Sequence, residues 1–364
     1  MSEKLLSVQD LHTSFFTDAG EVQAVNGVSF DLDPGEILGI VGESGSGKSV
    51  TAYSIMQILA DTGKITGGKI LYKGQALSTW SEKQMQSFRG KNCSIIFQDP
   101  MTSLNPVFTI GSQLKEAVVL HTTRRGAEAD GRVKELLELV GINEPEKRMK
   151  QYPFELSGGM RQRVMIAMAL ACEPDILIAD EPTTALDVTI QAQILDLLKR
   201  LQKEYGMAII IITHDLGVVA QICDKVNIMY AGRIVERGTV EEIFYNPQHE
   251  YTKGLLKSMP KLNQNGEKLE PIQGNPVDLF CLPKGCAFSS RCRKCMEICI
   301  EKYPAEVNYN ESGHAAACWR MIKELHESGT IDVVNGAPEG KPFVYNGAII
   351  AEAKKARGKD HGKR

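Results

Sequence analysis

The feature that most constrains the fold of this chain is a glycine-rich segment near its N-terminus, Gly42-Glu43-Ser44-Gly45-Ser46-Gly47-Lys48-Ser49. A short apolar run (36–41) precedes it and a helix-like pattern (48–59) follows it, which is the strand–loop–helix setting of a P-loop. The glycines let backbone N–H groups turn toward phosphates, and the helix N-terminus adds a partial positive charge. The sequence therefore predicts a nucleotide site in which Lys48 reaches the phosphates and Ser49 binds Mg²⁺. A glycine-rich turn that binds no nucleotide would not need a strand before it and a helix after it.

Short apolar segments and amphipathic segments alternate along most of the chain. Strands are expected at 5–11, 21–32, 36–41, 94–97, 176–179, 208–213 and 225–230, and helices at 48–59, 188–204 and 216–222. Buried strands that alternate with helices indicate a largely parallel sheet covered on both faces. Helical spacing from about 109 to 152 interrupts this alternation, so we expect an inserted helical subdomain at about 100–155.

Charge and hydropathy limit the setting in which the chain works. A net charge of -3 and a pI near 6.2 give no electrostatic basis for nucleic-acid binding. No apolar run approaches the roughly 18 residues that a membrane span needs, and the N-terminal residues lack the long apolar stretch of a signal peptide. We therefore expect a protein of the cytoplasm, where cysteines serve as thiols or metal ligands rather than disulfides.

Two acids end one of the predicted strands, and a histidine follows another. Asp180 and Glu181 come directly after 176–179, and His214 comes directly after 208–213. In P-loop enzymes a strand-end Asp holds the Mg²⁺ shell. Glu181 is then placed to act as general base toward the attacking water. The same sheet edge would bring His214 near the γ-phosphate, although a histidine in such a place is more often structural.

The segment Leu156-Ser157-Gly158-Gly159-Met160-Arg161-Gln162-Arg163 closely resembles the signature sequence of ABC ATPases. The resemblance covers about residues 4–250. It implies a P-loop NTPase fold with a mostly parallel sheet, an antiparallel β subdomain and an inserted α-helical subdomain. One departure is Met160, which stands where the family usually has Gln. The phosphate contacts come from Ser and Gly, so no loss of activity is expected.

The resemblance also assigns roles to residues outside the P-loop. Ser157, Gly158 and Gly159 would bind the γ-phosphate of ATP held by an opposite subunit. Gln98 would join the Mg²⁺ and water site and link it to the membrane partner, and Asp187 would contact the other subunit. Phe15 would stack on adenine, with its neighbour Phe16 as a rival.

A finer resemblance is to the ATPase subunits of dipeptide and oligopeptide importers. It rests on the segments 100–106 and 246–252 and on the cysteine pattern that begins at Gly285-Cys286; Glu250 departs from the Pro more usual there. It implies a heterodimer with a second ABC ATPase, two permease subunits, and an extracellular or periplasmic peptide-binding protein. The chain would then sit peripherally on the cytoplasmic face of the cell membrane. Related nickel importers share much of this pattern, so nickel or another small solute is an alternative substrate.

Six of the nine cysteines lie between Cys281 and Cys318. We expect four of them to bind a [4Fe–4S] cluster, namely Cys286, Cys292, Cys299 and Cys318. Zinc is the alternative, although zinc sites commonly use close Cys pairs. Cys281 and Cys295 are spare and could replace one of the four, and thiols without any metal are a third interpretation. A metal would hold together a segment with few apolar residues.

The predicted organisation is an ATPase domain (1–250), a C-terminal extension with a small Cys-rich metal module (251–320) and a tail (321–364) with a disordered end. Residues 260–283 are rich in Pro, Gly and Asn and are expected to form a linker or loop. The rival class is an ABC-type ATPase acting on DNA or ribosomes. Only about 107 residues separate Lys48 from Leu156, without sustained heptads, and the chain has one P-loop. A non-catalytic regulatory ATPase is disfavoured because Glu181 and His214 are present.

Overall fold

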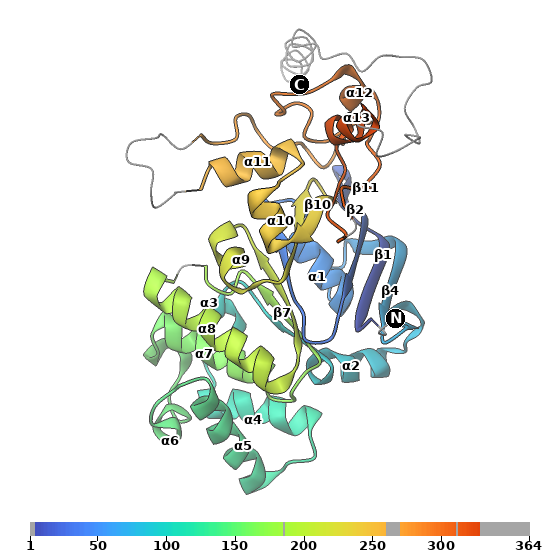
Figure 1. Ribbon diagram of the computed structural model, residues 1–364. Coiled ribbons are helices and arrows are strands. Elements are labelled where there is room, and N and C mark those ends of the chain that lie inside the picture. The colour runs from blue at the N-terminus through green and yellow to red at the C-terminus, as the bar shows by residue number, and fades with distance from the viewer. Residues whose placement is uncertain (1–3, 185, 260–269, 311, 328–364) are drawn as a thin grey trace.

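The computed structural model describes residues 4–184, 186–259, 270–310 and 312–327 (Figure 1). Its larger sheet has the strand order β11-β12-β10-β9-β3-β8-β7-β6. The strands are β3 (Ile37–Val41), β6 (Cys93–Ile96), β7 (Ile176–Asp180), β8 (Ala208–Thr213), β9 (Lys225–Tyr230), β10 (Arg233–Thr239), β11 (Val307–Asn308) and β12 (Ala315–Ala316). From β9 to β6 all neighbours are parallel, whereas β10 pairs with β9 in antiparallel fashion.

The parallel centre of this sheet is buried on both faces. Every residue of β3, β7 and β8 is buried. Side chains alternate between faces along a strand, so Ile209 and Ile211 enter one apolar cluster while Ile210 and Ile212 enter another. Burial on both faces explains why these strands have continuous apolar sequences and were predictable from them.

A second, antiparallel sheet has the order β2-β1-β4-β5. It contains β1 (Leu6–Thr17), β2 (Gly20–Leu32), β4 (Gly63–Tyr72) and β5 (Gln75–Ala76). The strand expected at 5–11 continues to Thr17, because β1 and β2 stay paired down to the Thr17–Gly20 turn. Neither β4, β5 nor the following helix α2 (Glu82–Lys91) was predicted from the sequence.

The helical pattern in the middle of the chain forms several short helices rather than one long one. They are α3 (Pro100–Ser103), α4 (Ile110–His121), α5 (Gly126–Leu139), α6 (Pro145–Arg148) and the 3₁₀ turn η2 (Pro153–Glu155). Leu114, Val118, Val133, Leu136 and Leu137 are fully buried in the cluster that also holds Leu177 of β7. The block therefore packs on the sheet, at the end of the molecule opposite the C-terminal residues (Figure 1).

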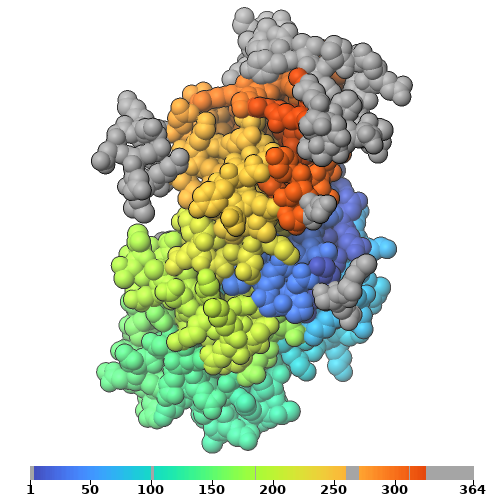
Figure 2. Space-filling model, viewed as in Figure 1, coloured from blue at the N-terminus to red at the C-terminus, as the bar shows by residue number. Residues whose placement is uncertain are grey.

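The C-terminal part begins with α10 (Val240–Tyr245) and α11 (Glu250–Lys257) and ends with α12 (Glu297–Glu301) and α13 (Trp319–Glu327). It packs directly against the rest of the molecule (Figure 2). One buried carboxylate, Glu236 of β10, joins the C-terminal part to the sheet. It accepts hydrogen bonds from the backbone N–H groups of Gln248 and His249 at 2.6 and 2.9 Å, and it lies 2.9 Å from His314 Nε2. Unpaired, this buried carboxylate would be costly, so its three contacts fix the extension to β10.

Several predicted segments fall partly outside the described residues. Of the expected linker, 270–283 has neither helix nor strand, and 260–269 lie outside the description. Helix α13 runs across the expected start of the tail at 321, and the expected disordered end (354–364) lies outside the described residues. Within the described part of the chain, no helix combines the length and apolar character needed to span a bilayer.

Candidate functional site

The P-loop follows β3 and leads into helix α1 (Lys48–Met56). Two of its glycines are required by close packing. A Cβ at Gly42 would lie 2.1 Å from the Met229 carbonyl oxygen, and one at Gly47, whose φ is 98°, would lie 2.3 Å from that of Ala24. The loop is therefore pressed against neighbouring backbone, and none of the described side chains caps the N-terminus of α1. Its free N–H groups suit an anion.

Lys48 is buried, with 5% of its surface exposed, and its ammonium turns back into the loop. Nζ donates to the carbonyl oxygens of Gly42 and Glu43 at 2.8 and 2.9 Å. Burial lowers the pKa of Lys48, although the nearby carboxylates of Glu181 and Asp180 oppose this shift. The cation lies where a phosphate held by the loop would bind.

Asp180 is fully buried at the end of β7 and is held by two residues of α1. Its carboxylate accepts hydrogen bonds from Ser49 Oγ at 3.0 Å and from Tyr53 Oη at 3.1 Å. Burial raises the pKa of Asp180, and burial together with this carboxylate raises the pKa of Tyr53 to about 12. Ser49 and Asp180 are thus adjacent and could share one Mg²⁺, an ion that prefers oxygen ligands.

Glu181 adopts a left-handed backbone conformation, with φ of 47°. Non-glycine residues rarely do so, and such strain often occurs at functional sites. Its side chain accepts hydrogen bonds from Gln98 Nε2 and Thr184 Oγ1, both at 2.8 Å, and lies 3.1 Å from His214 Nδ1. Burial would raise the pKa of Glu181, but the contacts with Thr184 and His214 and the charge of Lys48 leave it below its ordinary value. An ionised carboxylate there can accept a proton from water.

Part of this arrangement lines one open pocket of about 650 Å³ at the carboxyl edge of the sheet, whereas Lys48, Ser49 and Asp180 are not among its lining residues. Its lining joins the P-loop residues Gly42, Glu43 and Ser44 to Gln98, Glu181, Thr184 and His214. Leu255, Ser258, Pro271 and Ile272 of the C-terminal part also line it, although no sequence pattern indicated this. Tyr53 and Thr184 were also missed, although Tyr53 lies four residues after Ser49, on the same helical face.

Other predicted site residues lie outside that pocket. Ser157 is the exposed N-cap of α7 (Gly158–Ala169), and Asp187 is the exposed N-cap of α8 (Val188–Tyr205). Phe15 is partly buried in β1, whereas Phe16 is 45% exposed. The fold therefore leaves the signature segment, with Gly158 and Gly159, open at a helix N-terminus.

The four cysteines expected to bind a metal line one small cavity in the C-terminal extension. The Cys286 amide donates to the Cys299 carbonyl at 2.7 Å, and a Cβ at Gly285 would lie 2.2 Å from that same oxygen, so this crossing requires glycine. Burial raises the pKa of Cys286, and the neighbouring thiols of Cys299, Cys318 and Cys292 raise it further. Neither spare cysteine lines the cavity: Cys281 is exposed, and Cys295 is buried beside it.

The thiols are not arranged around a metal position in this structure. Among the described residues, no group of three or more His, Cys, Asp or Glu side chains could hold a metal ion. A tetrahedral zinc site needs all four sulfurs about 2.3 Å from the ion. The donor type fits a metal centre, whereas the spacing of the described side chains in this structure forms no metal-binding group of either kind.

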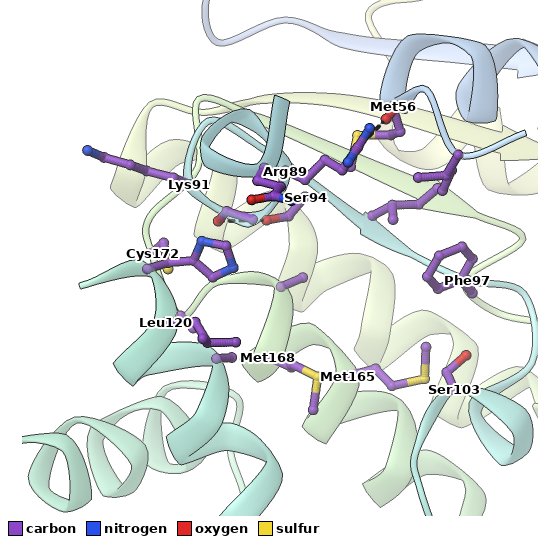
Figure 3. Close-up of a pocket in the computed structure, with 18 of the residues that line it drawn as sticks. Met56, Arg89, Lys91, Ser94, Phe97, Ser103, Leu120, Met165, Met168 and Cys172 are labelled. Atoms are coloured by element: carbon purple, nitrogen blue, oxygen red, sulfur yellow. Dashed lines mark hydrogen bonds between the residues drawn. The ribbon is translucent and has the colours of Figure 1, made fainter. Parts of the chain in front are cut away.

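A separate groove of about 810 Å³ lies between the sheet and the helical block. Figure 3 shows Met165 and Met168 of α7, Leu120 of α4 and Phe97 turned toward it. Leu120 is 69% exposed there. Arg89 closes one side by donating to the Met56 carbonyl at 2.8 Å.

The P-loop after β3, the acid pair at the end of β7, which β8 separates from β3, and the ABC-type signature segment occur here in one fold. They define an ATPase of the ABC class. Comparison with known families agrees: the family described as ABC transporter matches residues 25–184, and that described as oligopeptide/dipeptide transporter, C-terminal region, matches residues 235–299.

Comparison with individual known proteins defines the family more narrowly. The chain is 57% identical to the dipeptide transport ATP-binding protein DppD of Bacillus subtilis, over 87% of this chain and 95% of that protein. It is 52% identical to the oligopeptide transport ATP-binding protein OppD of Salmonella typhimurium, over 88% and 95%. The chain therefore belongs to the family of dipeptide and oligopeptide transport ATP-binding proteins.

Solved structures resemble the ATPase part. The ATP-binding cassette MJ0796, in a dimeric post-hydrolysis state with ADP and Pi, aligns with a TM-score of 0.59 and 26% identity, over 65% of this chain and 98% of its own. CbiO1 of Clostridium perfringens, part of the cbiONQ ABC transporter complex, aligns with a TM-score of 0.58 and 31% identity, over 67% and 92%.

The hydrogen bond from Tyr53 to Asp180 generates a prediction about Mg²⁺. Tyr53→Phe removes the hydroxyl that orients the carboxylate, and losing such a support commonly costs about tenfold in metal affinity. We expect the Mg²⁺ concentration for half-maximal ATPase activity to rise about tenfold. Tyr245→Phe, at a side chain 86% exposed, is the matched control. Unchanged Mg²⁺ dependence in Tyr53→Phe would show that Tyr53 does not position Asp180.

Proposed function

We propose that this chain hydrolyses MgATP to power the uptake of dipeptides and oligopeptides through a pair of membrane permeases. The observation that carries the substrate class is the extent of the family likeness: it includes the C-terminal region at 235–299 as well as the ATPase part. On this proposal the chain is peripheral to the membrane, on its cytoplasmic face, and does not act on nucleic acid. Transport of nickel instead would be an outcome of the uptake test below.

ATP binding would use the P-loop as found. The N–H groups of 42–47 surround the phosphates, and Lys48 exchanges its carbonyl partners for phosphate oxygens. Ser49, Asp180 and Gln98 would hold Mg²⁺, which supplies charge neutralisation of the phosphates when bound. Phe15, or its rival Phe16, would stack on adenine.

Hydrolysis would proceed by attack of a water oxygen on the γ-phosphorus, with cleavage of the bond to the β–γ bridging oxygen. Glu181 accepts the proton of that water, and its depressed pKa keeps it ionised for this role. His214 and Gln98 orient the carboxylate, since both contact it. ADP and phosphate are the products.

The complete site would need two chains. Ser157 and Gly158 are exposed at the N-terminus of α7 and Gly159 is partly exposed; the three would bind the γ-phosphate of ATP held by a second, homologous ATPase, with Asp187 at the same contact. The dimeric state of the MJ0796 cassette supports such an arrangement. We expect a heterodimer here, working with two permeases and an extracellular or periplasmic peptide-binding protein.

The groove of Figure 3 would receive a permease helix. It lies between the sheet and the helical block, beside the segment that follows β6 and leads to Gln98, and its wall is apolar at Leu120, Met165 and Met168. An amphipathic helix suits such a groove. Movement of Gln98 would connect this contact to Glu181, which it already touches.

The C-terminal cysteines would bind a [4Fe–4S] cluster. Four thiol groups that line one cavity support this proposal, because such clusters are held by four cysteine thiolates. Zinc is the alternative. The cluster would hold the extension together and would take no part in hydrolysis.

Glu181→Gln tests the assignment of the general base. The amide cannot take the proton, while the P-loop and the Mg²⁺ ligands remain. We expect ATP binding within about twofold of wild type and a fall in turnover of at least about a hundredfold. Glu204→Gln, an exposed change on α8, should have no effect. Turnover near the wild-type level would remove Glu181 from this role.

Leu120→Arg tests the groove and the transport function together. A charge on the apolar wall should block permease docking, so peptide uptake by the reconstituted complex should fall about tenfold or more while the ATPase activity of the two paired ATPase chains without permease stays unchanged. Tyr245→Arg is the control for an added surface charge. Uptake of nickel but not of peptides would reassign the substrate. Normal peptide uptake by Leu120→Arg would exclude the groove as the permease docking site.

The cysteine proposal is tested by purifying the protein without oxygen, recording its visible spectrum and assaying iron and zinc. Four iron atoms per chain and a brown colour are expected, and Cys292→Ser should lose both, whereas Cys281→Ser should retain them. A colourless protein with one zinc would reverse the choice of metal. A protein with neither metal would refute the proposal.

A further inference from the structure

The C-terminal extension reaches the P-loop through one buried arginine. Arg291 has a side chain only 5% exposed and makes a two-point contact with Glu43: Nη1 donates to Oε2 at 2.6 Å and Nη2 to Oε1 at 3.0 Å. Glu43 is the second residue of the P-loop and lies 248 positions away in sequence. Paired N–H donors that match a carboxylate fix its orientation as well as its charge.

The rest of Glu43 is held as well. Its amide donates to Tyr251 Oη of α11 at 2.9 Å, and its carbonyl accepts from Lys48 Nζ. Tyr251 packs on Tyr230 and Phe288, with ring centroids 4.7 and 5.3 Å apart. Glu43 is therefore bound on one side by the lysine of the ATPase and on the other by the extension.

Arg291 also fixes the wall of the pocket. Its Nε donates to the Gln273 carbonyl at 3.2 Å and its Nη2 to the Ile272 carbonyl at 3.3 Å. Ile272 lines the same pocket as Glu181 and His214. One side chain thus connects the P-loop to the segment that faces the reacting groups.

We propose that Arg291 is a positioning residue for nucleotide binding, which acts through Glu43 to hold the P-loop in the shape that receives phosphates. Two physical effects support this role of Arg291. Ordering a glycine-rich loop costs conformational entropy, and a loop already ordered binds its ligand more tightly. A carboxylate left unpaired beside the phosphates would also repel them, whereas the guanidinium neutralises it.

The test measures MgATP binding to the full-length chain by titration with a fluorescent ATP analogue. Arg291→Ala should weaken binding about tenfold, and Arg291→Lys by less. The maximal ATPase rate at saturating MgATP should stay within about twofold, because Arg291 touches none of the reacting groups. Arg293→Ala, two residues away with a side chain 62% exposed, is the matched control and should bind normally.

A double-mutant comparison separates positioning from general damage to the extension. In a Glu43→Gln background the Glu43–Arg291 ion pair is already lost, so adding Arg291→Ala should change affinity by less than about twofold. Persistence of the tenfold loss in that background would overturn the proposal, as would an affinity in Arg291→Ala within twofold of wild type. The readout is binding to a single chain, so failure of peptide transport would not affect it.

Discussion

The parallel register of β3, β8 and β7 is the constraint on which the site depends. Val41 pairs with Thr213, and Asp180 pairs with Ile212, so three strands end level with one another. The P-loop, His214 and Glu181 each follow one of those ends. The P-loop is more than a hundred residues from Glu181 and His214 in sequence, yet the three meet at one sheet edge. The strand register alone brings them together.

The sequence alone identified the site residues that belong to short, recognisable sequence patterns. Lys48 and Ser49 follow a glycine pattern, and Asp180 and Glu181 end an apolar strand, so a short window identifies each. It was also sufficient for β7 and β8, because strands buried on both faces have no polar positions to obscure them. By contrast β4 is mostly exposed or partly exposed and contains adjacent glycines, so it lacks both alternation and a continuous apolar run.

What the sequence did not reveal depends on long-range geometry. The left-handed conformation of Glu181 has no sequence signal, since glutamate disfavours it. The same holds for Arg291, whose importance comes from Glu43, a residue in another part of the fold. In the P-loop pattern, the position of Glu43 carries no specified residue type. The pattern could not show that the charge of Glu43 is paired, or by which segment.

The C-terminal extension is stabilised in a different way from the ATPase part. Its own apolar clusters are small: one has Met296, Trp319 and Ile322 as its fully buried members. Cores of this size supply little stability alone, so the segment depends on its attachments to the ATPase. Two of these attachments use carboxylates of the ATPase part, the buried Glu236 of β10 and the partly buried Glu43 of the P-loop, and both are costly to leave unpaired. Because the second lies inside the nucleotide cradle, order in the extension and order in the P-loop are linked, and each stabilises the other.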